Sequence, residues 1–411
     1  MKFFTLFLIG LLASVTSFGQ SGEKPYVVLV SFDGFRFDYA EKFDAPNFKS
    51  LMKKGANAEG LIPSFPSKTF PNHYSIVTGL YPGNHGLVDN YFYDPGRKEY
   101  YGMKNRARVT DPYYYGGIPL WKLARQNGIK SASMFWIGSE LTQHDLRPDY
   151  HFAYNESLPD STRIQQILSW LKLPESERPH FITLYFSSPD HEGHLYGPTS
   201  EKTKEAVLRA DQNLGAIMKG LEETKLPINT IVVSDHGMEE LITNEESYIF
   251  LSEILNRKDT TIRVSNGGSQ AHIYVSKKSQ VDSLYKILNK RTGKYSVFRT
   301  EDFPQHWHYK TLRAGDLLIT ASPGSYLVDE ERTAFLAKLR PGHSTGVHGY
   351  DPSAAKNMRG IFCAIGPQIK ANTTIPAFEN IHIYPFIAEI LGLPLPPIDG
   401  RLDVLKSILV Q

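Results

Sequence analysis

The stretch YVVLVSFDG, residues 26–34, is a continuous apolar run that ends on an aspartate and a glycine. Three later runs are equally short and rich in β-branched or aromatic residues, at positions 181–186, 230–234 and 360–365. Such runs are typical of strands that are buried on both faces of a sheet. The sequence therefore predicts a sheet of parallel strands built around residues 26–32.

Helical patterns separate these strands. They cover residues 44–54, 118–127, 161–171 and 200–225, and a further one follows near 384–391. Because strands and helices alternate, we predict an α/β fold with a mostly parallel central sheet and helices on both faces. Residues 241–344 consist of shorter mixed segments and predict a small inserted α+β subdomain, which leaves residues 21–240 and 345–411 as the catalytic core.

Composition excludes some partners. The 411 residues are 41% hydrophobic, which is enough for a large core. The chain has 45 Lys and Arg against 43 Asp and Glu, and no basic block of five or more residues. This balance argues against a nucleic-acid groove or an anionic membrane surface as the main partner, and the oligomeric state is not indicated.

The first twenty residues have one lysine, then an apolar run, then small and polar residues. This order predicts a signal peptide over residues 1–20, with a buried N-terminal element as the alternative. The apolar run is too short to span a bilayer comfortably, so we expect no transmembrane anchor in a mature chain that is exported to a periplasm or secreted. Cys363 is the one cysteine and lies in an apolar run, which indicates a buried hydrophobe and no disulfide framework.

Acids and histidines follow the predicted strands. In open α/β sheets, ligands bind beyond the carboxyl ends of the strands, where such side chains converge. Asp and neutral His are usual ligands of zinc, and an Asp and a His four residues apart can face the same way on one helical turn. A single pair of this kind is more often a capping Asp and an exposed His. Six residues at three strand ends and one loop instead predict a metal centre: Asp33, Asp190, His194, Asp235, His236 and His348.

The segment PSFPSKTFPNHYSIVTG, residues 63–79, supplies a hydroxyl group at Thr69. Six ligands and one hydroxyl are enough for two metal ions, the arrangement that many phosphoryl-transfer sites use. One ion can lower the pKa of the hydroxyl and make it a nucleophile. Pro71 suits the first turn of a helix, so Thr69 is expected at a helix N-terminus, where phosphate is favoured. Asn90 supplies an amide donor for a nonbridging phosphate oxygen.

Five ordered motifs carry a resemblance to a known family: SFDGF, the block from residue 63 to 90, PDHEGHLYGP, SDHGM and HGYDP. Together they resemble the nucleotide pyrophosphatase/phosphodiesterase family of the alkaline phosphatase superfamily, over about residues 25–400. The resemblance implies an alkaline phosphatase-like fold and hydrolysis through a phosphothreonine intermediate.

The same resemblance implies two Zn²⁺ ions. One would be held by Asp190, His194 and His348, and the other by Asp33, Asp235, His236 and the nucleophile Thr69. Asn90 matches an oxyanion donor, and the backbone N–H groups of Asp33 and Phe70 are further candidates.

The predicted substrate is a nucleotide diester or pyrophosphate. A dianionic monoester calls for extra fixed positive charge, and residues 131–146 contain no Lys or Arg. Phe70 and Tyr154 match family positions where aromatic rings sandwich a nucleobase, and Lys68 is expected to assist a distal phosphate. The predicted product is a nucleoside monophosphate.

Two other functions remain open at this stage. A phospholipid-headgroup (choline-type) phosphodiesterase on the same scaffold would need an aromatic cage that accepts a cation. A metal-stabilised binding protein without turnover is disfavoured because Thr69 and the full ligand set are present.

Overall fold

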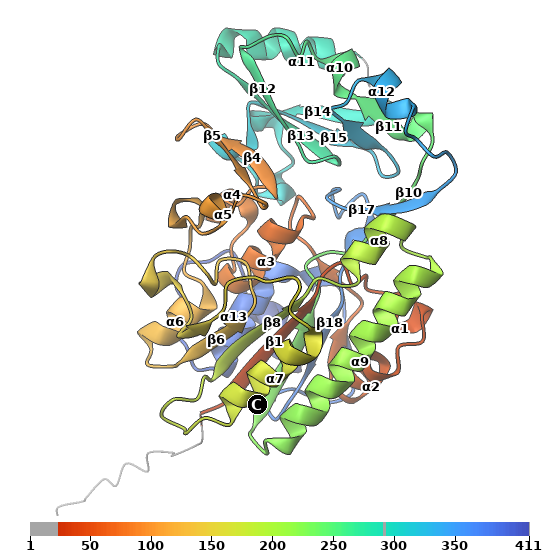
Figure 1. Ribbon diagram of the computed structural model, residues 1–411. Coiled ribbons are helices and arrows are strands. Elements are labelled where there is room, and N and C mark those ends of the chain that lie inside the picture. Colours follow the sequence, from red (N-terminus) through yellow and green to blue (C-terminus); the bar gives the residue numbers. More distant parts are fainter. Residues whose placement is uncertain (1–23, 291–292, 411) are drawn as a thin grey trace, which may run out of the picture.

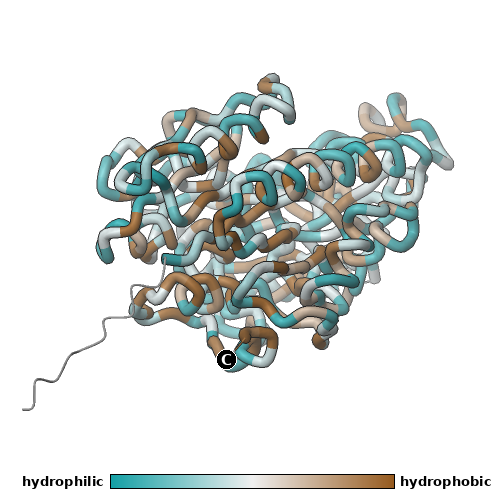
Figure 2. Tube along the Cα trace, turned by 90° about the horizontal axis from the view of Figure 1, so that it is seen from below, coloured by the Kyte–Doolittle hydropathy of each residue, from teal (hydrophilic) through white to brown (hydrophobic). Residues whose placement is uncertain are grey.

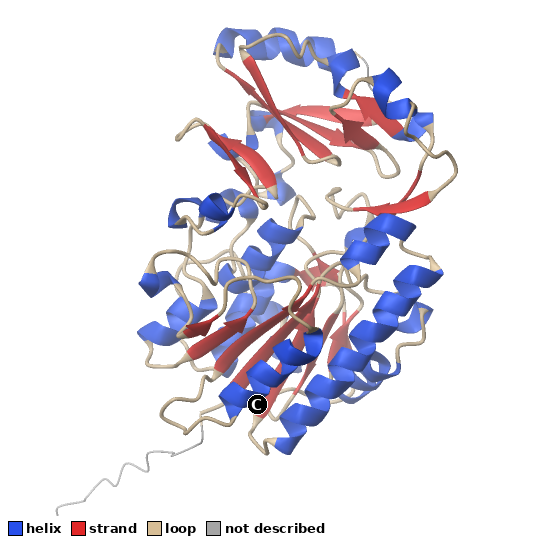
Figure 3. Ribbon diagram, viewed as in Figure 1, coloured by secondary structure: helices blue, strands red, loops and turns tan. Residues whose placement is uncertain are grey.

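The computed structural model describes residues 24–290 and 293–410, so the predicted signal peptide lies outside the described residues. Its centre is an eight-stranded sheet in the order β19-β2-β18-β9-β1-β8-β6-β7 (Figure 3). The strands are β1 (Tyr26–Phe32), β2 (Ala56–Ala58), β6 (Ser131–Met134), β7 (Tyr150–His151), β8 (Phe181–Phe186), β9 (Ile228–Val233), β18 (Phe362–Ile365) and β19 (Thr373–Ile375).

Strand β1 lies inside the sheet and is buried along its whole length. It pairs in parallel with β8 on one side and β9 on the other, so that Val28 lies opposite Ile182 and Thr230. Val27 and Leu29 belong to one hydrophobic cluster, and Val28 and Val30 to a second one on the opposite face. A continuous apolar run is thus explained by a strand that has a core on each side.

Helices cover both faces of this sheet (Figure 1). One hydrophobic cluster contains side chains of α2 (Pro46–Lys54), α7 (Asp160–Leu171) and α9 (Glu201–Glu223), together with the short α1 (Tyr39–Lys42). The other cluster contains side chains of α3 (Thr69–Thr78), α6 (Leu120–Gln126) and α13 (Ile383–Ile390). Figure 2 shows hydrophilic and hydrophobic residues alternating along the outer helices. The predicted α/β architecture is confirmed.

The direction of one strand differs from the expectation. β18 was predicted with the parallel strands, but it pairs antiparallel with β9 and with β2. The physical reason is the edge of the sheet from which the chain approaches β18. His348, which precedes β18 in the chain, lies at the carboxyl edge of the parallel strands, so β18 starts at that edge and runs in the opposite direction. Cys363 is fully buried in this strand, as predicted.

A second, four-stranded antiparallel sheet lies above the carboxyl edge of the first (Figure 1), in the order β12-β13-β15-β14. Its strands are β12 (Ile262–Asn266), β13 (Gln270–Val275), β14 (Tyr295–Arg299) and β15 (Leu317–Ala321), and nearby helices are α10 (Leu251–Ile254), α11 (Val281–Asn289) and α12 (Arg332–Leu336). Two short strand pairs accompany this region. Antiparallel β10 (Glu239–Ile242) and β17 (Ser344–Val347) lie where the chain enters and leaves it, and parallel β11 (Tyr248–Phe250) and β16 (Tyr326–Val328) lie within it.

The remaining elements lie in the connections. They are β3 (Leu61–Ile62) with β20 (Phe378–Glu379), the hairpin β4 (Tyr91–Asp94) with β5 (Glu99–Gly102), and helices α4 (Pro82–His85), α5 (Arg106–Val109) and α8 (Asp190–Tyr196). Within residues 24–290 and 293–410, no helix has the length and apolar character needed to cross a membrane.

Candidate active site

The six predicted ligands lie at the carboxyl edge of the central sheet. Asp33 directly follows β1, and Asp235 and His236 come two and three residues after β9. Asp190 and His194 lie on α8, which follows β8, and His348 directly follows β17. The two short strands β10 and β17 pair with each other, so the segments after His236 and before His348 run side by side. The topology therefore brings distant parts of the sequence to one place.

One group of ligand atoms comes from Asp33, Asp235 and His236, and these atoms all lie within 4.8 Å of one another. His236 Nε2 lies 3.0 Å from Asp235 Oδ2 and 3.5 Å from Asp33 Oδ1. All three side chains are buried. The hydroxyl oxygen of Thr69 lies 3.2 Å from the same His236 nitrogen. The predicted nucleophile is thus next to the predicted ligands of its ion.

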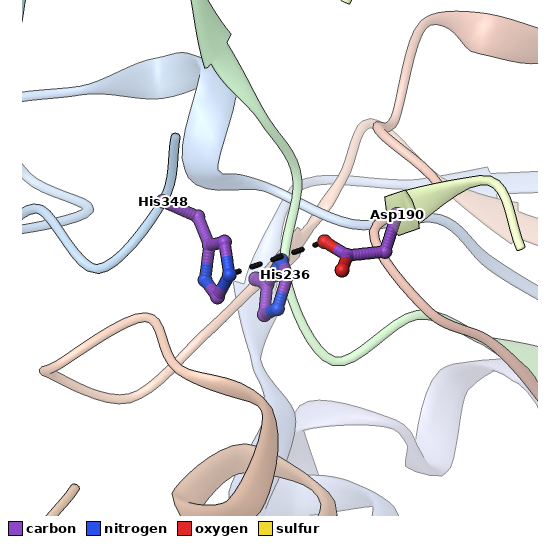
Figure 4. A group of neighbouring side chains, drawn as sticks. All are labelled: Asp190, His236 and His348. Carbon is purple, nitrogen blue, oxygen red and sulfur yellow. Dashed lines mark ion pairs between the residues drawn. The ribbon is translucent and has the colours of Figure 1, made fainter. Parts of the chain in front are cut away.

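A second group contains Asp190, His236 and His348, whose ligand atoms again lie within 4.8 Å (Figure 4). His348 Nε2 lies 3.9 Å from Asp190 Oδ1, and the rings of His236 and His348 stack at 3.6 Å. His194 lies beside this group and not within it. Its Nε2 lies 3.5 Å from Asp190 Oδ2, and its ring centroid lies 5.0 Å from that of His348.

The hydrogen bonds of the Nδ1 atoms show which nitrogen of each histidine is available to a metal ion. The Nδ1–H of His194 donates to Gly346 O at 2.7 Å, that of His236 to Gly237 O at 2.8 Å, and that of His348 to Ser67 O at 2.7 Å. A carbonyl oxygen can only accept, so each ring carries its proton on Nδ1 and presents Nε2 to the centre. This is the tautomer that a second hydrogen bond fixes in metal-binding histidines. With one free nitrogen, His236 can serve one of the two groups.

The surroundings of the three carboxylates indicate whether metal cations fit this site. Asp33 Oδ1, Asp190 Oδ1 and Asp235 Oδ2 are buried and have no hydrogen-bond donor. Burial, and next the neighbouring Asp235, raise the pKa of Asp33 well above its usual range. Buried carboxylate oxygens without a donor are costly unless a cation compensates them. Three such oxygens among three imidazole nitrogens form a donor set that suits divalent metal ions.

Thr69 is the first residue of α3, after Lys68 in extended conformation, as the position of Pro71 predicted. One turn later, His73 connects the nucleophile to the centre. Its Nδ1–H donates to Thr69 O at 3.0 Å, and the same nitrogen lies 3.4 Å from Asp235 Oδ2. Sequence reasoning assigned no role to His73. Its spacing of four residues from Thr69, on the same face of a helix, was the available signal.

The side chain of Asn90 is held by its oxygen. The N–H of Phe70 donates to Asn90 Oδ1 at 2.8 Å, which leaves the NH₂ group for a ligand. The two backbone donors that were considered beside Asn90 are both engaged: Phe70 N–H in this bond, and Asp33 N–H with Phe186 O at 2.9 Å. The structure therefore corrects that expectation, and Asn90 keeps its role as a candidate donor.

A cavity of about 350 Å³ opens beside Thr69. Asp33, Asp190 and His194 line it, and its aromatic walls are formed by Phe70, Phe135, Trp136, Phe152, Tyr154 and Tyr185. Tyr154 is 39% exposed as a residue, and its ring contacts that of Phe135 at 5.3 Å between centroids. Arg106, also in the lining, is paired with Glu140 through two hydrogen bonds of 2.6 and 2.7 Å. Phe70 and Tyr154 thus share one cavity.

Tyr185 was missed by sequence reasoning. It lies next to Ser31 in the register of β1 and β8, and its hydroxyl donates to Asp33 Oδ2 at 2.7 Å. This bond fixes the orientation of the carboxylate. A tyrosine near the carboxyl end of an apolar strand, beside the strand that carries Asp33, was a usable signal.

Lys68 does not reach the cavity. Its ammonium group is buried and donates to Gly267 O at 2.7 Å and to His348 O at 3.0 Å. The expected contact with a distal phosphate is therefore replaced by contacts within the protein. Lys68 connects the segment of the nucleophile to His348 and to the turn between β12 and β13.

The chain is similar to known proteins along most of its length. The chain is 34% identical over 403 residues to the human ectonucleotide pyrophosphatase/phosphodiesterase family member 1, a match that covers 94% of this chain and 42% of the human protein. It is 33% identical over 401 residues to a venom phosphodiesterase of Macrovipera lebetinus, covering 94% of this chain and 45% of that protein. The chain thus spans less than half the length of these relatives.

Solved structures extend the comparison. Murine ectonucleotide pyrophosphatase/phosphodiesterase 5 superposes with a TM-score of 0.85 at 29% identity, covering 94% of this chain and all of the other. A second structure of that protein is an inactive threonine-to-alanine variant in complex with AMP, with the same score and coverage. The model of the family described as type I phosphodiesterase/nucleotide pyrophosphatase matches residues 27–351. On the fold, the site and this match, the chain belongs to the type I phosphodiesterase/nucleotide pyrophosphatase family.

Proposed function

We propose that this chain is a two-zinc phosphodiesterase/pyrophosphatase that hydrolyses nucleotides through a phosphothreonine and releases a nucleoside monophosphate. The observation that carries the proposal is the contact of 3.2 Å between Thr69 Oγ1 and His236 Nε2, inside a buried Asp and His cluster and beside an aromatic cavity. The AMP complex of the murine relative supports a nucleotide ligand, and the inactive threonine variant of that relative supports a threonine nucleophile.

Two sets of side chains would hold the zinc ions. Asp33, Asp235 and His236 would hold the ion beside Thr69, and Asp190, His194 and His348 the other. We assign His236 to the first set because its single free nitrogen lies closest to Asp235 and Thr69. When bound, the ions supply a lowered pKa for the hydroxyl and positive charge opposite the phosphoryl group. The number of ions in this proposal rests on this division.

The protein's own groups then define the reaction. The Thr69 hydroxyl gives its proton to solvent, and its oxygen attacks phosphorus. The bond from phosphorus to the leaving oxygen breaks, and an alkoxide, which takes up a proton from water, or a nucleoside phosphate leaves. The Asn90 NH₂ group donates to a nonbridging oxygen while the charge on it grows. Water next attacks the phosphothreonine, which restores the Thr69 hydroxyl and releases the monophosphate. Two successive in-line displacements retain the configuration at phosphorus.

The aromatic cavity selects the substrate. Phe70 and Tyr154 line it and would take a base between them, as predicted from their positions. Two cationic side chains line the cavity: Arg106, which is paired with Glu140, and Lys104. Residues 135–140 line the same cavity without a Lys or Arg. The paired Arg106 and the aromatic walls favour a diester with an organic group over a dianionic monoester.

We also propose that the chain is exported, with a signal peptide over residues 1–20. Relatives named venom phosphodiesterase and ectonucleotide pyrophosphatase/phosphodiesterase support an extracellular location. Residues 241–344 form, in this proposal, a subdomain inserted into a core of residues 21–240 and 345–411.

Three chromogenic substrates test the function: the nitrophenyl ester of thymidine monophosphate, nitrophenyl phosphocholine and nitrophenyl phosphate. We expect the first to be cleaved with the highest kcat/KM. Preference for the phosphocholine ester would instead favour the headgroup diesterase, and turnover of none of the three would favour a binding protein.

Variants test the assigned residues. Thr69→Ala is expected to abolish turnover while the zinc content stays the same, and the matched Thr69→Ser variant, which keeps a hydroxyl, should retain part of the activity. Phe70→Ala and Tyr154→Ala should each raise KM for the thymidine ester by roughly 5- to 150-fold, because base stacking contributes about 1–3 kcal/mol. An equal rise in KM for nitrophenyl phosphocholine would contradict the proposal that Phe70 and Tyr154 stack on a base.

A further inference from the structure

A second cavity, of about 440 Å³, adjoins the first, and His194 lines both. Its walls come from α8, β17 and the region of β11, β16 and α12, including the rings of Tyr248, Tyr326 and Phe335. We propose that this cavity, here called the leaving-group cavity, binds the second nucleoside of a substrate in which two nucleosides are joined through phosphates. The inference rests on the proposed function and adds to it a binding site for the nucleoside on the leaving group.

The position of the cavity follows from the direction of the reaction. In an in-line displacement the leaving group departs from phosphorus on the side opposite the nucleophile. A row of imidazoles starts at Thr69: His236 lies 3.2 Å from its hydroxyl, and His348 stacks on His236 at 3.6 Å. His194, 5.0 Å from His348, is the far end of this row, and the leaving-group cavity opens beyond it.

The lining favours a flat ring over a pyrophosphate. Tyr248 and Phe335 pack edge to face at 4.6 Å and are each partly exposed. The charged side chain in the lining, apart from His194, is Asp329, which pairs with Arg257 at 3.0 Å. Among the described residues, no Lys or Arg lines the cavity. A pyrophosphate leaving group would find no cationic side chain there, whereas a base can stack on the rings.

The cavity is also held in shape. Tyr326 lies against the turn between β12 and β13, where Gly268 has φ +82° and a Cβ at that position would lie 1.9 Å from the Tyr326 ring. The Asn266 side chain in the same lining donates to Leu327 O at 3.1 Å and accepts from Gly268 N–H at 2.9 Å. The Asn266 amide is therefore engaged within the protein, and the rings of Tyr248, Tyr326 and Phe335 make up the aromatic part of the lining.

A rival place for the departing nucleoside is another hollow that shares Met103, Lys104 and Arg106 with the lining of the first cavity. An open hollow of about 910 Å³ is lined by Asn90, Tyr91, Tyr100 and Lys104, among others. The rings of Tyr91 and Tyr100 stack on each other at 5.5 Å, and Tyr100 is 37% exposed. This hollow borders Asn90, which serves a nonbridging oxygen and thus lies off the line of displacement. Tyr100 therefore provides a matched control.

The test measures binding without turnover. In the zinc-loaded Thr69→Ala protein, the affinities for diadenosine diphosphate and for AMP are measured by calorimetry. Combining this background with Phe335→Ala or Tyr248→Ala should weaken the affinity for diadenosine diphosphate by roughly 5- to 150-fold, the range that base stacking gives, and leave the affinity for AMP unchanged. The Tyr100→Ala control should change neither affinity. Phe335 is partly exposed on a short helix, so its variant should fold, and a thermal melt checks this.

The outcomes separate clearly. Unchanged affinity for diadenosine diphosphate in both variants would overturn the inference, as would an equal loss for AMP. A loss with Tyr100→Ala alone would move the departing nucleoside to the hollow beside Asn90. The proposed function fails separately, if the unaltered protein does not cleave the nitrophenyl ester of thymidine monophosphate.

Discussion

Replacing Lys68 by Met separates two roles for a residue next to the nucleophile. Met keeps most of the length and the apolar stem but removes the ammonium group. That group is buried, and it donates to Gly267 O at 2.7 Å and His348 O at 3.0 Å. If Lys68 bound a substrate phosphate, the change would affect substrates with distal phosphates. Because it holds protein carbonyls instead, the change should affect the fold and the position of His348.

The magnitude follows from these bonds. A hydrogen bond to a charged group contributes about 1.5–3 kcal/mol, and two are lost. Part of this is offset because the ammonium no longer has to be buried, a cost that burial shows by lowering the pKa of Lys68. We therefore expect the free energy of unfolding to fall by about 2–4 kcal/mol. His348 keeps its bond to Ser67 O at 2.7 Å, but loses one of two donors to its carbonyl, the other being Ser269 Oγ at 3.0 Å.

The assay has three readouts. Urea unfolding gives the loss of stability, competition with a zinc chelator gives the affinity for the ion, and steady-state kinetics compare ATP with the nitrophenyl ester of thymidine monophosphate. We expect the zinc affinity to fall by roughly 10- to 100-fold, as when supports of a metal ligand are removed. The ratio of KM for the two substrates should stay constant. A selective rise of KM for ATP, at unchanged stability, would refute the reasoning and restore Lys68 as a phosphate ligand.

Two further predictions concern acid and metal. Burial lowers the pKa of His85 to about 3, where Leu87 N–H donates to its Nδ1 at 3.2 Å. In the unfolded chain this histidine has an ordinary pKa of about 6.5 and binds more protons below that pH, so its contribution to stability is full above about pH 6.5 and is lost towards pH 3. Urea unfolding measured from pH 7 to 4 should therefore show a free energy of unfolding that falls less steeply as the pH is lowered in the His85→Gln variant than in the unaltered protein. A chelator should abolish turnover and lower the melting temperature, because three buried carboxylate oxygens lose their compensating charge, and added Zn²⁺ should restore both; full activity in a metal-free protein would contradict the site.

Much of the fold could be predicted because the local pattern and the packing agree. Residues 26–32 and 181–186 were predicted as strands and are β1 and β8 with the same bounds. A short run that is apolar on both faces is most stable as a strand inside a sheet that is covered on both sides. The antiparallel direction of β18 could not be predicted. It depends on where the chain returns from the second sheet, and residues 360–365 carry no signal of direction.

The candidate ligands were predictable because charged residues at strand ends are rarely accidental. What the sequence could not give is the direction of long side chains. Lys68 and Thr69 are neighbours, yet one points to the carbonyls of Gly267 and His348 and the other to His236. Tyr185 and His73 act through partners that are distant in sequence, so their contacts appear only in three dimensions.

The candidate centre draws its side chains from nearly the whole length of the polypeptide, from the residue after β1 to the residue after β17. No shorter fragment contains a complete set, and His348 is supported by a turn of the second sheet through Ser269. A nascent chain therefore cannot assemble this centre before His348 has been synthesised. Under the proposed export, nucleotides on the side of the membrane where the chain is made would be spared until the exported chain has folded.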